Sequence, residues 1–130
     1  MIDDLDLEYE THEVICPEGR LRVITAGDTG PPVLLLSGGG TDSATLSWRH
    51  LIPDLADSFR VFAPDWPKQG HSRPWQGIAD HDRLVRCVTE VLDHFGLDQV
   101  ALVGLSQGGA VTLSYAIDHP DRVTRIIALA

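Results

Sequence analysis

The fold of this chain is decided by one stretch of its sequence, Val100-Ala101-Leu102-Val103-Gly104-Leu105-Ser106-Gln107-Gly108-Gly109-Ala110. The stretch begins with an apolar run typical of a buried strand and ends where a helix is expected to begin, with Ser106 between the two. Gly104 and Gly108 complete a G-x-S-x-G pattern, in which a side chain at either glycine would collide with backbone in a sharp strand-to-helix turn. The pattern predicts a serine hydroxyl raised above the end of a strand, where it is a candidate nucleophile.

The helix expected after Ser106 favours negative charge close to that serine. The first N–H groups of a helix have no partner within the helix, and the helix dipole is positive at this end. An oxyanion formed above Ser106 would therefore be stabilised, as acyl transfer requires.

Apolar runs and turn signals elsewhere alternate between strand and helix patterns. Strands are predicted over residues 8–16, 20–26, 33–36, 60–63, 99–103 and 123–129. Helices are predicted over residues 45–58, shortened or kinked by Pro53, then along the apolar stripe 84–95, and over residues 107–118. On the second of these helices, Arg83, His81 and His94 are expected on the solvated face.

This alternation predicts an α/β fold with a mainly parallel sheet and flanking helices. The turn signal at residues 17–19 predicts an antiparallel N-terminal hairpin at one edge of the sheet. No linker or repeat divides the sequence, so residues 1–130 are expected to form one domain or part of one.

Composition restricts the classes of partner. The 130 residues are 43% apolar, and 19 acidic against 10 basic residues give a formal net charge of −9. With no basic run, we expect neither nucleic acid nor an anionic membrane as a partner. The first six residues contain three aspartates and no basic residue, unlike a signal peptide, and no apolar run reaches the length of a membrane span, so we expect a cytoplasmic protein. Cys16 and Cys87 fit no metal-binding pattern, and we expect free thiols and no metal site.

Three motifs in order resemble the N-terminal half of the α/β-hydrolase superfamily, over nearly all of the chain. They are the apolar strand and glycine loop at residues 34–40, the segment 65–72 and the elbow around Ser106. The second motif in the family reads D-x-x-G-x-G-x-S, and here Lys68 replaces its first glycine.

The resemblance implies roles for individual residues. Ser106 would be the nucleophile, and the backbone N–H groups of Gly39 and Gln107 would hold the oxyanion. Gly40, Trp66 and His71 are candidate pocket residues, and no cofactor is implied. The implied activity is a serine hydrolase that cleaves a small-molecule carboxylic ester, lactone, thioester or amide through an acyl-serine intermediate. A serine at the elbow argues against epoxide-hydrolase and dehalogenase chemistry, which uses aspartate there.

Two alternatives stay open at this point. The same acyl-enzyme would serve an acyltransferase, in which an alcohol or amine replaces water. In addition, the family's catalytic acid and histidine follow later strands, and none of the six histidines of this chain occupies such a position. We therefore expect a C-terminally incomplete domain. The rival interpretation to a serine hydrolase is that the chain is a catalytically incomplete fragment or a non-enzymatic binding module. Its last strand, residues 123–129, would be an uncovered apolar edge through which the chain self-associates.

Overall fold

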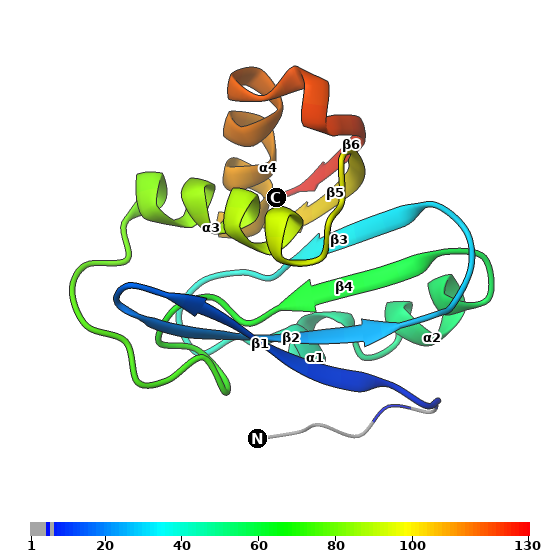
Figure 1. Cartoon of the computed structure of the whole chain (residues 1–130), viewed down its shortest axis with the longest axis horizontal. Coiled ribbons are helices and arrows are strands. Elements are labelled where there is room, and N and C mark those ends of the chain that lie inside the picture. The colour runs from blue at the N-terminus through cyan, green and yellow to red at the C-terminus, as the bar shows by residue number, and fades with distance from the viewer. Residues whose placement is uncertain (1–4, 6) are drawn as a thin grey trace.

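A computed structural model of the chain describes residue 5 and residues 7–130, so most of the acidic start of the sequence, and the signal-peptide expectation drawn from it, lies outside the described residues. The described residues form a six-stranded mixed sheet in the order β1-β2-β4-β3-β5-β6 (Figure 1). Its strands are β1 (Glu10–Cys16), β2 (Gly19–Ala26), β3 (Pro32–Leu36), β4 (Arg60–Pro64), β5 (Val100–Leu105) and β6 (Val123–Leu129). Strands β3 to β6 run parallel, while β1 and β2 form the antiparallel hairpin at one edge. The α/β fold and the hairpin predicted from sequence are confirmed.

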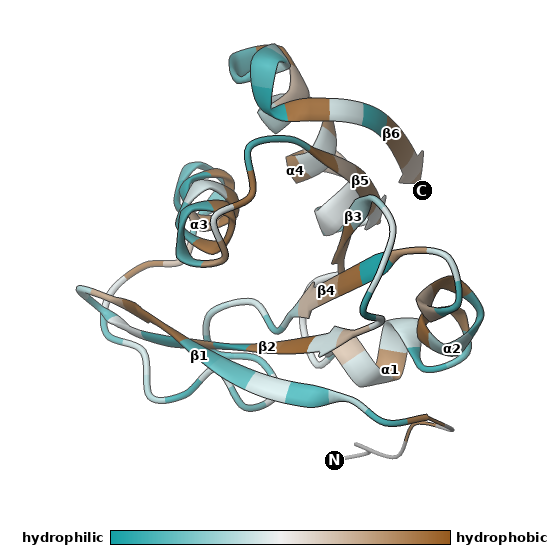
Figure 2. Cartoon of the chain, turned by 45° about the vertical axis from the view of Figure 1, so that its right-hand side comes forward, coloured by the Kyte–Doolittle hydropathy of each residue, from teal (hydrophilic) through white to brown (hydrophobic). Residues whose placement is uncertain are grey.

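Helices cover both faces of the sheet (Figures 1 and 2). The helices are α1 (Ala44–Trp48), α2 (Leu51–Ala56), α3 (His81–His94) and α4 (Gln107–Asp118). Because side chains alternate along a strand, β3 sends Leu34 and Leu36 into the core beneath α3 and α4, and Val33 and Leu35 into the core beneath α1 and α2. A strand buried on both faces needs apolar residues at every position, which explains the unbroken apolar run.

The prediction of one helix over residues 45–58 that Pro53 shortens or kinks is wrong. Two short helices stand there, separated at residues 49–50. Ser43 starts the first of them, because its hydroxyl accepts a hydrogen bond from the Leu46 backbone N–H at 3.1 Å. Pro53 lies in the first turn of α2, where the missing N–H of proline has no intrahelical partner to lose.

Arg83 was expected on the solvated face of α3 but is buried, with 5% of its surface exposed. Its guanidinium donates to Glu18, in the turn between β1 and β2, at 2.6 and 3.1 Å, and to Glu90 on its own helix. It also lies 5.2 Å from the centre of the Trp75 ring. Two carboxylates and an aromatic face thus compensate the cost of burying this charge. The hydrogen bonds to Glu18 also join α3 to the hairpin.

Both cysteines are buried free thiols on this side of the sheet. Burial raises the pKa of Cys16 and of Cys87 to about 12. Since the thiolate is the reactive form, neither thiol is a nucleophile in the folded chain near neutral pH.

Strand β6 forms the edge of the sheet opposite the hairpin, as the sequence predicts. Ile126, Ile127 and Leu129 on it are exposed, at 40%, 56% and 47%. Self-association through this edge stays a prediction. Within the described residues, none of the helices combines the length and the apolar character needed to cross a membrane.

Candidate active site

Ser106 lies in a strained turn between β5 and α4. Its backbone has φ 54° and ψ −113°, in the left-handed half of conformational space that residues other than glycine rarely adopt. The packing around it leaves no room for side chains at the flanking glycines. A Cβ on Gly104 would lie 2.1 Å from the Gly108 carbonyl oxygen, and one on Gly108 would lie 2.2 Å from the Leu36 carbonyl oxygen. The predicted elbow is therefore present, and Ser106 itself is exposed.

Backbone hydrogen bonds hold the elbow in place. The Ser106 N–H donates to the Leu129 carbonyl of β6 at 2.7 Å, and the Ser106 carbonyl accepts from Ala110 at 3.0 Å. The Ser106 N–H is thus occupied by the neighbouring strand. The next N–H along the chain, that of Gln107, belongs to the first turn of α4, where N–H groups have no partner inside the helix.

The glycine loop after β3 approaches the elbow directly. A Cβ on Gly38 would lie 3.8 Å from the Ser106 Cβ, and one on Gly39 would lie 2.8 Å from the Gln107 side-chain oxygen. The structure therefore brings Gly39, Gln107 and Ser106 together at the carboxyl ends of β3 and β5. Their roles as oxyanion donors and nucleophile stay predictions.

Side chains that the sequence analysis missed hold the glycine loop. The Asp42 carboxylate accepts a hydrogen bond from the Gly38 N–H at 2.9 Å and another from the Ser47 hydroxyl. From the other side, the Gln69 amide nitrogen donates to the carbonyls of Gly38 and Gly40, each at 3.1 Å. The position of Asp42 just before a helix is typical of a residue that bonds nearby backbone, and was the one available signal. Nothing in the spacing pointed to Gln69.

Asp65 connects the loop after β4 to the rest of the site. Its buried carboxylate pairs with Arg22 at 2.9 Å and accepts hydrogen bonds from the backbone N–H groups of Ala44 at 2.8 Å and His71 at 2.9 Å. Through the His71 N–H, this carboxylate fixes the loop that follows β4. It also anchors the start of α1 and a strand of the hairpin, so its carboxylate is occupied by structural bonds.

The three candidate pocket residues do not share one pocket. Gly40 and Trp66 line a pocket of about 240 Å³ together with Lys68, Gln69 and Gln107, next to the elbow. Trp66 is buried, and its indole N–H donates to the Ser37 carbonyl at 2.7 Å. His71 is exposed and lines a separate pocket with side chains of the hairpin.

No histidine in the described part of the chain hydrogen-bonds to Ser106. His81 bonds the Ser114 hydroxyl at 2.8 Å, His12 bonds the Thr25 hydroxyl at 3.1 Å, and His94 and His119 lie against the rings of Phe95 and Tyr115. His50 is exposed after α1. With His71, which lines a separate pocket, none of the six histidines is placed by a hydrogen bond to act as the general base for Ser106 in the described structure.

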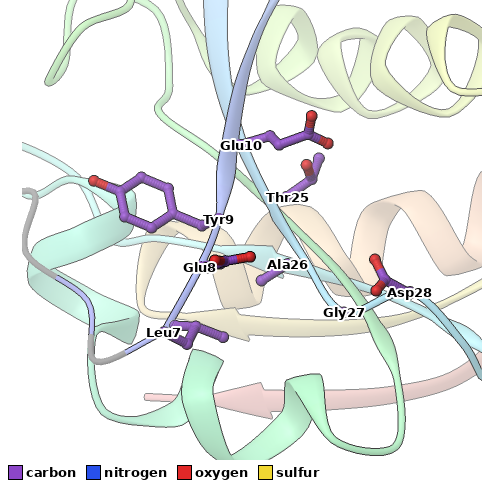
Figure 3. A pocket seen from close by; sticks show the side chains of 8 residues that line it. All are labelled: Leu7, Glu8, Tyr9, Glu10, Thr25, Ala26, Gly27 and Asp28. Atoms are coloured by element: carbon purple, nitrogen blue, oxygen red, sulfur yellow. The ribbon is translucent and has the colours of Figure 1, made fainter.

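Another pocket, of about 570 Å³, is lined by none of the elbow residues, and Figure 3 shows the side chains that form it. It is lined by the residues before and at the start of β1, among them Glu8 and Glu10, and by the end of β2 with Asp28. Because Ala26 at the end of β2 pairs with Val61 at the start of β4, this pocket opens at the amino ends of the parallel strands. The pocket carries several carboxylates. Even so, the described residues contain no group of three or more His, Cys, Asp or Glu side chains placed to hold a metal ion.

Known proteins resemble this chain in sequence and in fold. A family model described as the alpha/beta hydrolase fold matches residues 31–130. The soluble epoxide hydrolase of Corynebacterium sp. (strain C12) is 34% identical over 96% of this chain and 43% of its own length. The 2-hydroxymuconate semialdehyde hydrolase of Pseudomonas sp. (strain CF600) is 37% identical over 87% of this chain and 44% of its own length. The crystal structure of epoxide hydrolase A from Mycobacterium thermoresistibile matches with a TM-score of 0.82 at 34% identity, over 92% of this chain and 38% of that one.

The chain thus spans less than half the length of these relatives. Their names describe hydrolases of different kinds, two of them epoxide hydrolases and one a semialdehyde hydrolase. The elbow serine was expected to argue against epoxide-hydrolase and dehalogenase chemistry, and proteins named for both reactions are among the relatives.

Proposed function

Because this chain belongs to the alpha/beta hydrolase fold family, we propose that it forms the nucleophile-bearing part of a hydrolase that cleaves a carboxylic ester, lactone, thioester or amide through an acyl-Ser106 intermediate. The observation that carries the proposal is the exposed serine at the strained elbow, between the glycine loop and the first turn of α4. Strain of this kind persists where the surrounding structure imposes it, and it is concentrated at functional sites.

The chemistry of a hydroxyl nucleophile favours acyl substrates. Attack of the Ser106 oxygen on a carbonyl carbon would give an oxyanion, and we assign its stabilisation to the backbone N–H groups of Gly39 and Gln107. The close approach of Gly39 to the Gln107 side chain supports this assignment. Expulsion of the alcohol, thiol or amine leaves an ester, whose carbonyl water then attacks to release the acid and restore the serine. Attack of the same oxygen on an epoxide or a haloalkane would leave an ether, which has no carbonyl for water to attack. A serine elbow therefore supports acyl chemistry over the reactions named for the epoxide hydrolases.

We further propose that residues 1–130 are the N-terminal portion of one hydrolase domain, and that the base for Ser106 comes from another part of the complete protein. Two findings support this: among the described residues no histidine hydrogen-bonds to Ser106, and the chain covers less than half of each relative.

A fluorophosphonate probe, which modifies activated serines, tests the nucleophile. We expect the complete protein to be labelled at Ser106, with the site located by mass spectrometry, and the Ser106→Ala variant to remain unlabelled. Ester hydrolysis should fall by about 10³-fold or more in that variant, as is typical when a triad nucleophile is removed.

Ser114→Ala is the matched control, because Ser114 has a histidine partner in His81 but lies along α4 and outside the elbow. It should leave labelling and hydrolysis unchanged. Undiminished labelling or turnover in Ser106→Ala would overturn the proposal, and loss of both in Ser114→Ala would move the nucleophile to that residue.

A further inference from the structure

The peptide groups of the glycine loop are held by hydrogen bonds at nearly every position. Gly38 donates its N–H to the Asp42 carboxylate at 2.9 Å, and its carbonyl accepts from the Gln69 side-chain nitrogen at 3.1 Å. The Gly40 carbonyl accepts from the same nitrogen at 3.1 Å, and the Gly39 carbonyl accepts from the Asp42 N–H at 3.4 Å. Within the part of the chain that the structure describes, the Gly39 N–H has no hydrogen-bond partner, and Gly39 is exposed. This N–H is therefore available to a substrate oxygen.

The direction of the Gly39 N–H is set by the carbonyl of the residue before it. The peptide bond between Gly38 and Gly39 is trans, and in a planar trans peptide the N–H points opposite to the C=O. Gln69 holds that C=O, so it also fixes where the Gly39 N–H points. The position matters because the loop lies against the elbow, where a Cβ on Gly38 would lie 3.8 Å from the Ser106 Cβ.

The fold accepts two costs in placing the Gln69 amide. Its side-chain oxygen is buried and, among the described residues, has no hydrogen-bond partner, which is unfavourable for a buried acceptor. Turning the amide round would place that oxygen against two carbonyl oxygens, so the two acceptors fix the orientation. The preceding residue, Lys68, has φ 72°, a left-handed conformation that a lysine does not favour. Strained backbone of this kind is concentrated at functional sites.

The loop after β4 gives Gln69 a fixed base. The Gln69 N–H donates to the Trp66 carbonyl at 3.0 Å, and the Gln69 carbonyl accepts from the Ser72 N–H at 2.8 Å. The Ser72 hydroxyl in turn donates to the Asp65 carbonyl at 2.7 Å. Because β3 and β4 are parallel neighbours in the sheet, the loops that follow them leave it at the same edge (Figure 1). The amide is thus in place before a substrate arrives, as effective oxyanion stabilisation requires.

We propose that Gln69 is a positioning residue for the hydrolase reaction: by holding the Gly38 and Gly40 carbonyls, it aims the Gly39 N–H at the oxyanion that forms when Ser106 attacks. The inference rests on the function proposed above and adds to it a residue that acts through the backbone. A correctly aimed donor contributes most in the transition state, where the oxygen carries charge, and little while the substrate carbonyl is neutral. Loss of Gln69 should therefore slow the chemical steps and leave substrate binding nearly unchanged.

The Gln69→Met variant of the complete protein tests this role. Methionine has a similar unbranched length and lacks both N–H donors. The kcat for hydrolysis of 4-nitrophenyl acetate should fall by about 10- to 100-fold, somewhat less than the roughly 10²- to 10³-fold cost of removing an oxyanion donor outright. Acylation and deacylation use the same donor and should slow together, so KM should stay within about twofold. Gln69→Glu keeps the length but can only accept when ionised, and it should lose as much activity.

Gln99→Met is the matched control. The Gln99 side-chain nitrogen also donates to a backbone carbonyl, that of Asp121 at 3.0 Å. Gln99 precedes β5, whereas Ser106 follows the other end of that strand. This substitution should leave both kcat and KM unchanged.

Backbone NMR tests the positioning without catalysis. The amide signals of Gly39 and Thr41 should shift in Gln69→Met, because each N–H shares a peptide unit with a carbonyl that Gln69 holds. Circular dichroism establishes that the variant is folded. An unshifted Gly39 signal, or a raised KM with unchanged kcat, would overturn the inference.

The two proposals fail in different ways. Labelling of Ser106 in the original protein, together with full kcat in folded Gln69→Met, would overturn the role of Gln69 alone. Absence of Ser106 labelling would instead overturn the proposed function, on which this role depends, and the NMR signals would still show whether Gln69 orients the loop.

Discussion

At Gly108 a single hydrogen atom in place of a side chain allows the elbow to form. A Cβ there would lie 2.2 Å from the Leu36 carbonyl oxygen and 2.6 Å from that of Ser37, and both acceptors are backbone atoms that cannot swing away. Gly108→Ala should therefore destabilise the protein by about 2 to 3 kcal/mol, as overpacking does, although alanine favours the helix by roughly 1 kcal/mol. Urea unfolding followed by circular dichroism measures the change.

Gly77→Ala is the control for that substitution. Gly77 has φ 95° but no neighbouring atom within 4 Å of an added Cβ, so only backbone strain of about 1 to 2 kcal/mol is expected. If Gly108→Ala were no more destabilising than Gly77→Ala, the close packing of the elbow against β3 would be wrong.

Backbone requirements made part of the site predictable from sequence. Glycines at fixed spacing around Ser106 show where backbone must approach backbone, and this placed Ser106 in a strand-to-helix turn, as the structure has it. Gly39 and Gln107 were added by the resemblance to the α/β-hydrolase superfamily. Gln69 was not predictable, because its role depends on the direction in which a long side chain crosses between two loops. The placement of His71 on a different pocket has the same cause, since the loop after β4 turns around Asp65.

At the scale of elements, α3 is held to the hairpin by charge as well as by its apolar stripe. The hydrogen bond from Arg83 lowers the pKa of Glu18 below its ordinary value of 4.5. A carboxyl with a lower pKa in the folded state adds stability that is fully present above pH 4.5 and is lost as the pH falls through the folded value. The folded protein should therefore lose stability in acid below about pH 4.5, in part through this one contact.

The Glu18→Gln variant tests this contribution. Its stability should match that of the original protein more closely at acidic pH than at neutral pH, because the two differ only while Glu18 is ionised. The measurement is the urea midpoint at a series of pH values from neutral to acid. Glu13→Gln is the control, because Glu13 pairs with Arg20 at 3.1 Å on the exposed side of the hairpin, where an ion pair contributes about 1 kcal/mol or less. A constant difference between Glu18→Gln and the original protein at every pH would contradict the prediction.

Elements with a long, strict pattern were predicted well, and short ones were not. The helix after Ser106 and the strand at residues 123–129 have the predicted bounds. The segment after the glycine loop contains too few apolar positions to show that it is two helices, since the break depends on a cap at Ser43 and on packing beneath the sheet. The burial of Arg83 was missed because one of its two carboxylate partners, Glu18, lies in the turn between β1 and β2, far from α3 along the chain.

At the scale of the whole molecule, the two edges of the sheet differ in their protection. On strand β1, Ile15 is the one large apolar residue that is exposed, and Glu10, Thr11 and Glu13 are exposed polar residues. Charged side chains of this kind discourage pairing with another sheet. Strand β6 instead exposes apolar residues over its second half, with Arg125 as its one charged residue.

This difference predicts that the 130-residue chain associates with a second copy of itself through β6. An exposed strand edge offers unpaired N–H and C=O groups, and apolar side chains on it add the burial that makes strand pairing favourable. Sedimentation velocity over a range of concentrations should show a dimer or larger species, and Ile127→Lys should shift the chain toward the monomer because a charge would then be buried at the contact. Ile78→Lys is the matched control, since Ile78 is 79% exposed in the loop before α3 and far along the chain from β6. A chain that stays monomeric at every concentration would count against association through β6, as would an oligomer that both substitutions weaken equally.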